Sequence, residues 1–286
     1  MKLAGHGSAA DLRRDFLTSA EFSKRNGPDL AYSASRCVVI KEIDADLRLF
    51  VDLSDVAIGL NIVRDRYEVD ESRFIEATVR PGDTVLDIGA NVGFHTIRMA
   101  SRVGSTGCVY AFEPVVQNLE LLDRSIRENG FEGRVVVVRQ AVGEASGEAE
   151  MVFLSLDERA FNSGGASLRA PDGKLLPGHQ VIRVPVLALD NYPLRRPIRF
   201  IKIDIEGAEP LAMRGARELL RSDRPPILSE IHPVQLLELT GRTAADFIAE
   251  MASVGYRCHL LEDGRVGRAI SGATDDRIRS VVFLPM

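Results

Sequence analysis

The sequence is poor in cysteine and has no long apolar run. Its three cysteines, Cys37, Cys108 and Cys258, lie far apart, are odd in number and form no C-x-x-C pair. This spacing supports neither a disulfide framework nor a thiolate zinc site, so we expect core cysteines in a reduced, cytoplasmic protein. No apolar run approaches the roughly 18 residues of a membrane span, and the first residues lack a signal-peptide apolar region. We therefore expect no membrane span.

An excess of basic residues is also missing. The chain has 36 Lys and Arg against 41 Asp and Glu, a net charge of −5 and a pI near 5.7. These values do not indicate a nucleic-acid surface, although Arg195 and Arg196 form a local basic pair. With 286 residues, 45% of them hydrophobic, the chain can form one large α/β domain or one domain with an added N-terminal piece. We expect a small-molecule partner rather than nucleic acid.

The central motif lacks the second glycine of a dinucleotide-binding turn. The segment Thr84–Thr96 reads TVLDIGANVGFHT, which predicts a strand that ends at Gly89, a tight turn, and a helix that opens at Gly93. Such a turn places backbone N–H groups beside a ligand over the end of the strand. A dinucleotide site requires G-x-G-x-x-G, but Asn91 occupies the second glycine position. The motif therefore favours another nucleotide-like cofactor.

Two carboxylates indicate which cofactor this is. Asp87 lies in the turn, where its charge would repel a phosphate but suit an ammonium group. Glu113 ends the next predicted strand, Cys108–Phe112, and follows Gly89 by 24 residues, close to the offset of a ribose-binding acid. S-adenosylmethionine has the ammonium group, the ribose and no phosphate. The pair Asp87 and Glu113 thus favours this cofactor.

The N-terminal third predicts an extension before the main domain. The segments 37–43 and 47–53 are rich in β-forming residues and flank a turn, so we expect a hairpin beside the main sheet. A helix is predicted over 72–79, before Pro81 and Gly82. We accordingly divide the chain into an arm and hairpin extension, residues 1–62, and a cofactor-binding domain, residues 63–286.

From Thr84 onward, predicted strands and helices alternate. This alternation is typical of a mostly parallel sheet with helices on both faces. One helix is predicted to begin at Pro210 and to include Leu219 and Leu220, and a capping box at Thr243 predicts another. The long connection 156–180 is rich in Gly, Ser, Pro and Asp, and we expect it to form a lid. A closing antiparallel pair is predicted over 256–261 and 281–284.

Four of the predicted parallel strands finish in an acid. These acids are Asp87, Glu113, Asp204 and Glu230. Because the carboxyl ends of parallel strands lie on one edge, where α/β proteins bind ligands, we expect the four to converge. The alternative is that each acid caps the helix that follows it.

Several segments of the sequence resemble those of a known family. The segments VLDIGANVGFHT, AFEP, VPVLALDNY, IRFIKIDIEGAEP and ILSEIHP resemble the FkbM-type methyltransferases over about residues 64–233, and KIDIEGAE is the most specific part. That resemblance implies an S-adenosylmethionine-dependent O-methyltransferase of small molecules. It also implies the α/β, Rossmann-like class I methyltransferase fold, a seven-stranded, mostly parallel sheet whose last strand is antiparallel.

The resemblance further implies how the cofactor is held. Residues 87–93 are expected at the methionine end, Glu113 at the ribose hydroxyls, and Gln140 with Ala141 at the adenine edge. The complete set of expected cofactor-binding residues is Asp87, Gly89, Ala90, Asn91, Gly93, Phe94, Glu113, Gln140, Ala141 and Asp204.

Catalysis requires the acceptor oxygen in line with the methyl group and a destination for the acceptor proton. His232 is the residue type best suited as a base near neutral pH, and Asp204 and Glu230 are the other expected catalytic residues. His232 could instead mark the helix entry before Pro233, with its ring bonded to backbone. Asp204 and Glu230, with Glu206, could alternatively share a divalent cation such as Mg²⁺, although no known ligand spacing supports this.

The function that we predict is O-methylation of a small-molecule hydroxyl, on a sugar, a polyketide or another secondary metabolite. Two other functions remain open. A nicotinamide-dependent oxidoreductase would share the strand, turn and helix but should have glycine at position 91. A cofactor-binding module without catalysis would bind S-adenosylmethionine and turn over no acceptor.

Overall fold

The structure is a computed structural model that describes residues 38–44, 46–55, 57–157, 160–161, 166–168, 179–272 and 277–286. The predicted N-terminal arm lies outside the described residues. Most of the predicted lid, residues 156–180, also lies outside them. In the described part of the chain, no helix has both the length and the apolar character needed to cross a membrane.

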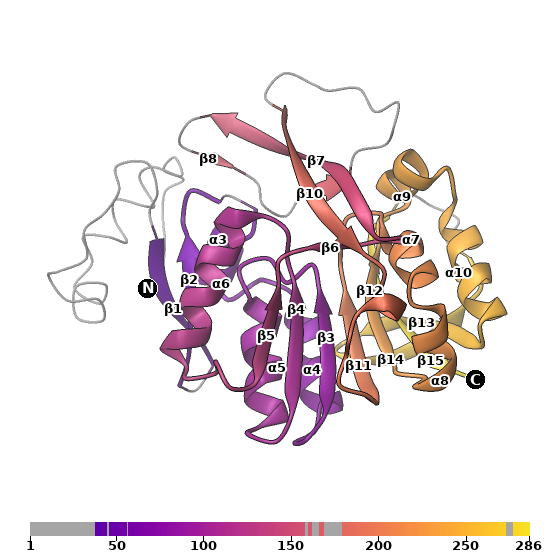
Figure 1. Cartoon of the computed structure of the whole chain (residues 1–286), viewed down its shortest axis with the longest axis horizontal. Helices are drawn as coiled ribbons and strands as arrows, with labels where there is room; N and C mark the ends of the chain where they lie inside the picture. Colours follow the sequence, from indigo (N-terminus) through magenta and orange to yellow (C-terminus); the bar gives the residue numbers. More distant parts are fainter. Residues whose placement is uncertain are drawn as a thin grey trace, which may run out of the picture.

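An eight-stranded sheet forms the centre of the molecule (Figure 1). Its strand order is β14-β13-β15-β12-β11-β3-β4-β5. The strands from β12 to β5 are parallel, whereas β15 is antiparallel to both of its neighbours. The strands are β3 (Thr84–Ile88), β4 (Cys108–Phe112), β5 (Val135–Val138), β11 (Ile198–Ile203), β12 (Ile227–Ile231), β13 (Tyr256–Glu262), β14 (Arg265–Ile270) and β15 (Arg279–Pro285).

The predicted count of seven strands is wrong by one. Without β14, the sheet has the seven expected strands, and its last strand in the chain, β15, is antiparallel as the resemblance implies. The eighth strand, β14, is a hairpin partner of β13, joined by the turn Asp263–Gly264, where both residues have positive φ. As an edge strand it is exposed or half-buried along its whole length. It therefore lacks the apolar alternation by which a strand is recognised in sequence.

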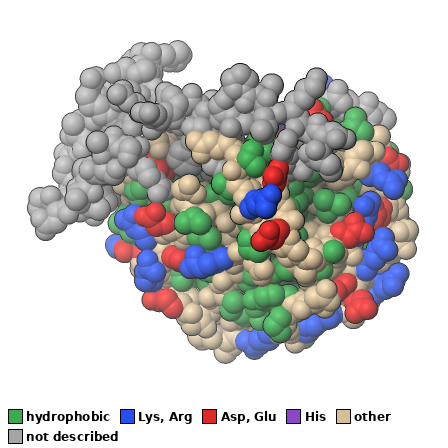
Figure 2. Space-filling model, turned by 45° about the horizontal axis from the view of Figure 1, so that its top comes forward, with side chains coloured by type: hydrophobic (Ala, Val, Ile, Leu, Met, Phe, Trp, Pro, Cys, Tyr) green, Lys and Arg blue, Asp and Glu red, His purple; other side chains and the backbone are tan. Residues whose placement is uncertain are grey.

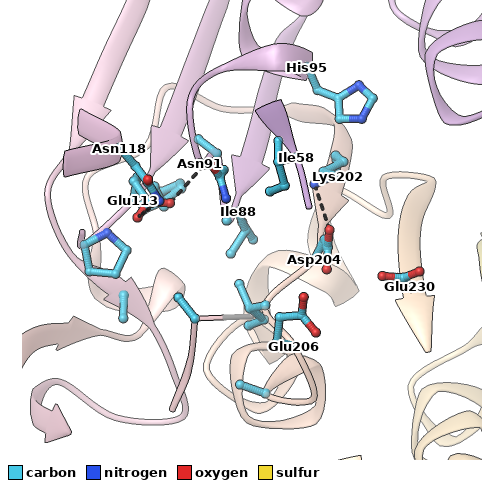
Figure 3. Close-up of a pocket in the computed structure, with 18 of the residues that line it drawn as sticks. Ile58, Ile88, Asn91, His95, Glu113, Asn118, Lys202, Asp204, Glu206 and Glu230 are labelled. Carbon is cyan, nitrogen blue, oxygen red and sulfur yellow. Dashed lines mark hydrogen bonds and ion pairs between the residues drawn. The ribbon is translucent and has the colours of Figure 1, made fainter. Parts of the chain in front are cut away.

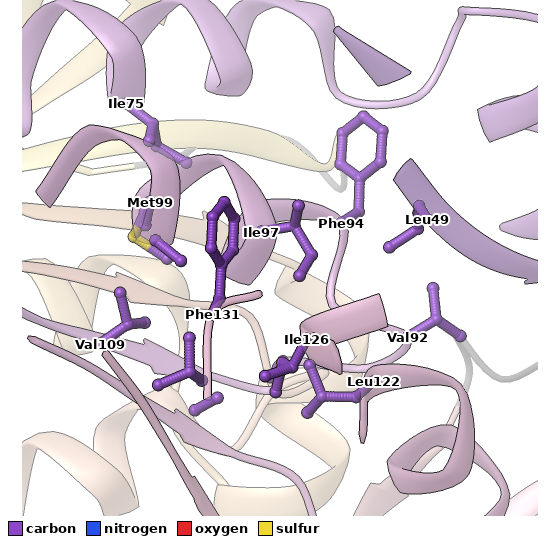
Figure 4. Close-up of a cluster of buried hydrophobic side chains, with 14 of the residues drawn as sticks. Leu49, Ile75, Val92, Phe94, Ile97, Met99, Val109, Leu122, Ile126 and Phe131 are labelled. Carbon is purple, nitrogen blue, oxygen red and sulfur yellow. The ribbon is translucent and has the colours of Figure 1, made fainter. Parts of the chain in front are cut away.

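Helices cover both faces of this sheet, as predicted. Side chains alternate along β3, so that Val85 packs into one core, whereas Leu86 and Ile88 pack into the other. The first core also contains α4 (Val69–Thr78), α5 (Phe94–Val103) and α6 (Val116–Glu128) (Figure 4). The second core contains α7 (Glu209–Arg214), α8 (Arg217–Ser222), α9 (Pro233–Thr240) and α10 (Ala244–Ser253).

The single helix predicted after Pro210 is divided into α7 and α8. The chain breaks at Gly215, where an added Cβ would lie 2.1 Å from the carbonyl oxygen of Gly143. The side chain of Asp190 then accepts hydrogen bonds from the backbone N–H groups of Glu218 and Leu219, at 2.9 Å each. These bonds start the second helix, and they come from a distant segment that local sequence does not indicate.

The N-terminal hairpin is present, as a separate two-stranded sheet that is not hydrogen-bonded to the main one. Its strands, β1 (Val38–Asp44) and β2 (Leu47–Asp52), pair with each other and pack on α5 and α6. The N–H of Arg48 donates to Asn129 Oδ1 and that of Phe50 to Ser125 Oγ, both at 2.9 Å. The hairpin and α3 (Gly59–Val63) share a core with the sheet. The division at residue 62 stays a prediction.

A second, smaller sheet lies over the carboxyl edge of the main one (Figure 1). Its long strands, β7 (Gly147–Asp157) and β10 (His179–Leu187), are antiparallel. The short strands are β6 (Ala141–Val142), β8 (Ala160–Phe161) and β9 (Ser167–Leu168). This sheet contributes Met151 and Leu168 to the wall of the cavity described next.

Candidate active site

A cavity of about 610 Å³ lies at the carboxyl ends of β3, β4, β11 and β12 (Figure 3). Of the four strand-end acids, Glu113, Asp204 and Glu230 line it. Asp87 does not. Asp87 is 1% exposed, and its Oδ2 accepts a hydrogen bond from Thr96 Oγ1 in the first turn of α5. The cavity therefore lies at the edge expected from the strand pattern, and three of the four acids line it.

Two positions of the turn after β3 require glycine, because neighbouring atoms lie too close for a Cβ. Gly89 has a φ of +81°, and a Cβ there would lie 2.0 Å from the carbonyl oxygen of Asp204. Gly93 has a φ of +93°, and its Cβ would lie 2.6 Å from Leu122 Cδ1. Gly89, Ala90, Asn91 and Phe94 line the cavity. Gly93 is outside the lining and instead lets α5 pack against α6.

Glu113 is held rigidly at the end of β4. Its Oε1 accepts hydrogen bonds from Val115 N at 2.8 Å and Asn118 Nδ2 at 3.3 Å, and its Oε2 accepts one from Asn91 N at 2.9 Å. The residue is 4% exposed, and burial raises the pKa of its carboxyl to about 7 against the opposing effect of these N–H donors. Gln140 and Ala141, the residues expected at the adenine edge, line the same cavity.

The other end of the cavity contains a cluster of charged side chains, which we call the charged cluster. Lys202 lies within β11 and is 5% exposed, with its Nζ 3.5 Å from Asp204 Oδ2. Although burial favours the neutral amine, the carboxylates of Asp204 and Glu68 raise the pKa of Lys202 above its ordinary value. The charged cluster comprises Glu68, His95, Lys202, Asp204, Glu206 and Glu230.

Glu68 and His95 form a hydrogen bond across the cluster that the sequence did not indicate. His95 Nε2 contacts Glu68 Oε2, and the side chain of Tyr67 also hydrogen-bonds Glu68. Burial opposes ionisation of Glu68, but the charges of Lys202 and His95 hold the pKa of its carboxyl at about 2. Only Lys202 had a signal in the sequence, since a lysine inside the apolar strand IRFIKI must find a buried counter-ion.

The other three carboxyls of the cluster have pKa values above their ordinary ones. Burial raises the pKa of Asp204, although the nearby Lys202 opposes this shift. Burial, with the charges of Asp204 and Glu230, raises the pKa of Glu206 to about 9. Burial and the charge of Asp204 raise the pKa of Glu230 to about 8. Carboxylates thus outnumber the cations at this end of the cavity.

We expect the free energy of unfolding of the ligand-free protein to decrease as pH rises from about 5 to about 9. Glu113, Glu230 and Glu206 have folded pKa values of about 7, 8 and 9, all above their ordinary value of 4.5. Their contribution to stability is complete below the unfolded pKa and is lost as pH rises through the folded pKa. Urea unfolding at pH 5.5, 7 and 9 measures the free energy of unfolding. In the variant Glu206→Gln, this free energy should decrease less between pH 7 and pH 9. Constant or rising stability over the range would contradict it.

His232 lines the cavity at the start of α9. It is the N-cap of that helix, and its Nδ1 accepts a hydrogen bond from the N–H of Gln235 at 3.4 Å. Because Nδ1 is the acceptor, the neutral ring carries its proton on Nε2 and can donate, but not accept, with that nitrogen. This contact is the one expected if His232 marks the start of the helix, with its ring bonded to backbone. The role of His232 as a base stays a prediction.

The carboxylates of the charged cluster do not form a recognisable metal centre. Among the residues that the structure describes, no group of three or more His, Cys, Asp and Glu side chains is arranged to hold a metal ion. Lys202 instead contacts Asp204, the residue that the shared-cation alternative places at the metal. The choice between a metal and a base is left to the chelator experiment described below.

Comparisons with known proteins identify the family. Residues 87–258 match the family described as "Methyltransferase FkbM domain". A solved structure of a methyltransferase FkbM from Methylobacillus flagellatus KT is 17% identical, with a TM-score of 0.43, and the match covers 78% of this chain and 52% of that one. This chain thus spans about half the length of that relative.

Two further solved structures are similar at comparable levels. A putative rRNA-methylase from Clostridium thermocellum is 14% identical, with a TM-score of 0.46, over 76% of this chain and 93% of that one. A putative methyltransferase from Streptococcus mutans, in complex with SAH, is 9% identical, with a TM-score of 0.43, over 76% and 96%. Since the family match spans more than half of the sequence, the chain belongs to the FkbM family of methyltransferases.

Proposed function

We propose that this methyltransferase uses S-adenosylmethionine to methylate a hydroxyl group of a small molecule. One observation carries the proposal: a single cavity joins the positioned carboxylate of Glu113 to the charged cluster around Asp204. The first end suits the nucleoside of the cofactor, and the second suits an acceptor that must lose a proton. The cavity volume of about 610 Å³ is within the range of small-molecule sites.

The residues at the Glu113 end fit the proposed cofactor. The two carboxylate oxygens of Glu113 accept three N–H groups from the protein, so the carboxylate is fixed in orientation, and Oε2 retains a lone pair for a ribose hydroxyl. Asn91, with the rest of the glycine turn, borders the methionine end, and Gln140 the adenine edge. When bound, S-adenosylmethionine supplies a methyl group that is already electrophilic. The protein therefore needs chiefly to position the acceptor and exclude water.

The acceptor proton must pass to a side chain of the charged cluster. Asp204 follows β11 directly, and its backbone N–H bonds to the carbonyl oxygen of Ile88 at 3.0 Å, so it lies against the glycine turn. Because His232 Nδ1 accepts a backbone N–H, the neutral ring has its proton on Nε2, and the carboxylates are the better bases. We assign Asp204 as the proton acceptor, Glu230 as its neighbour in the cluster, and His232 as a donor to the acceptor molecule.

The charges favour a small molecule over a nucleic acid as the acceptor. Four acidic side chains, Glu68, Asp204, Glu206 and Glu230, and a single lysine line the acceptor end of the cavity among the described residues, so this end offers few partners to a phosphate backbone. On the face shown in Figure 2, basic and acidic side chains of the described residues are interspersed rather than gathered into a basic patch. Binding of RNA or DNA relies on such patches.

Glu113→Ala should weaken binding of S-adenosylmethionine by about 1.5–3 kcal/mol, the usual range for hydrogen bonds to a charged group. The reason is that the substitution removes the carboxylate that accepts from the ribose in the proposed complex. Isothermal titration calorimetry measures the loss, with exposed Glu132→Ala as the matched control. An unchanged dissociation constant in a folded Glu113→Ala variant would remove Glu113 from the site.

The same titration separates the two alternative functions. A nicotinamide-dependent oxidoreductase would bind NAD or NADP in preference to S-adenosylmethionine. We expect neither to bind, because Asn91 with its side chain replaces the glycine that a pyrophosphate approaches. A non-catalytic module would bind the cofactor and methylate no hydroxylated compound.

A further inference from the structure

The second sheet has an apolar face that no step of the proposed reaction requires. Along β10, the buried Val184 and Val186 alternate with the exposed Arg183 and Pro185. Because side chains alternate between the two faces of a strand, one face of this sheet is buried and the other is exposed. Five apolar side chains gather at the buried face, and we call them the second-sheet cluster. The cluster comprises Val115, Ala141, Met151, Val184 and Val186.

The second-sheet cluster attaches this sheet to one particular end of the cavity. Val115 belongs to the main domain, two residues after Glu113, and its N–H donates to Glu113 Oε1 at 2.8 Å. Ala141 follows Gln140, belongs to β6 and is the parallel partner of Val186 in β10. Glu113 and Gln140 are the residues that the proposed function places at the ribose and the adenine. The second sheet therefore borders the nucleoside end of the cavity.

Met151 is the long side chain of the second-sheet cluster that reaches the cavity. It is 7% exposed and lines the cavity, as does its antiparallel partner Leu168 in β9. Val184 belongs to the same cluster and is buried as well, but it lies outside the cavity lining. The surface that Met151 keeps exposed is therefore open to a ligand in the cavity.

Resting on the proposed function, we propose that Met151 packs against the adenine base of the bound cofactor, which makes the second sheet part of the cofactor site. Adenine is a flat aromatic ring, and the polarisable thioether of methionine makes favourable contacts with aromatic rings. Gln140 and Ala141 would then bind the edge of the base, whereas Met151 would cover one of its faces. Leu168, in the connection that the sequence predicts to form a lid, pairs with Met151 and so belongs to the nucleoside end.

Methyl NMR of the whole chain tests this contact directly. The protein has six methionines, so labelling their methyl groups with ¹³C gives a simple spectrum, in which Met151→Leu identifies the Met151 signal. Saturation with SAH should move this signal upfield, because an aromatic ring shields a methyl group that lies over its face. Saturation with adenosine should do the same. A nuclear Overhauser effect should also join the Met151 methyl group to a ring proton of the adenine.

Substitutions then separate a contact with the base from a role in packing the sheet. By calorimetry, Met151→Ala should weaken binding of SAH about 3- to 10-fold, and binding of adenosine by the same factor. Met151→Leu, which nearly conserves the volume, should retain most of the affinity. Val184→Ala is the matched control, because it removes apolar volume from the same cluster without altering the cavity lining, and it should keep the affinity of the wild type.

Three results would overturn the inference. The first is a Met151 signal that neither moves upfield nor shows the Overhauser effect when SAH is bound. The second is an equal loss of affinity in Met151→Ala and Val184→Ala, which would show that Met151 acts only through the packing of the sheet. The third is a loss in Met151→Ala for SAH but not for adenosine, which would place Met151 at the amino-acid tail. Binding of SAH without the Met151 contact refutes only this inference, whereas a wild type that fails to bind SAH refutes the proposed function.

Discussion

Replacing Lys202 by methionine should lower the free energy of unfolding at pH 8 by about 3–5 kcal/mol, the cost of leaving buried charges without their partner. Lys202 is 5% exposed and faces the carboxylates of Asp204 and Glu68. Methionine preserves the volume of the side chain and removes only the charge. Urea unfolding of the two proteins at one ionic strength measures the difference.

The pH dependence of this difference follows from Glu68. Its folded pKa of about 2 is depressed, so its contribution to stability is present above the ordinary value of 4.5 and is lost as pH falls toward 2. Lys202→Met removes the main cation that depresses this pKa, so the gap between the two proteins should narrow on acidification. Lys41→Met is the matched control, because Lys41 pairs with a highly exposed Asp65 and should cost less than about 1 kcal/mol. An equally small cost for Lys202→Met would show that the cluster is well hydrated.

Asp204→Asn should lower turnover by a factor of about 10²–10⁴, the usual contribution of general acid–base catalysis. Asparagine keeps the size of the side chain but cannot take the proton of the acceptor, so the affinity for SAH should change little. The measurement uses an acceptor that the wild type methylates, with the methylated product quantified by mass spectrometry. His232→Ala is the comparison, and it should cost about tenfold or less, because the His232 Nδ1 accepts a backbone N–H.

Two other outcomes assign the chemistry differently. A large loss in His232→Ala with a small loss in Asp204→Asn would make His232 the base, as its residue type alone suggests. Loss of activity with a chelator, and recovery with Mg²⁺ or Mn²⁺, would place a metal at Asp204 and Glu230. Activity that is insensitive to the chelator and dependent on Asp204 is the result that we expect.

The sequence by itself determined most of the order of elements and the position of the candidate site. Apolar runs ending in Glu113, Asp204 and Glu230 predicted the strands, because burial on both faces requires continuous apolar side chains. Parallel strands then place their carboxyl ends on one edge, which is where the cavity lies. The capping box that starts α10 at Thr243 and Asp246 is likewise a local signal, and it is present in the structure.

Only the tertiary structure decided how the side chains pair within that edge. Asp87 is turned away from the cavity to Thr96, Glu68 meets His95, and Lys202 meets Asp204. Most of these contacts join elements far apart in the chain, so no local period encodes them. The same reason explains the hairpin, which packs on α5 and α6 through hydrogen bonds to Ser125 and Asn129, and the exposed edge strand β14. Local periodicity specifies which face of an element is buried, whereas the partners on that face depend on the packing of the whole chain.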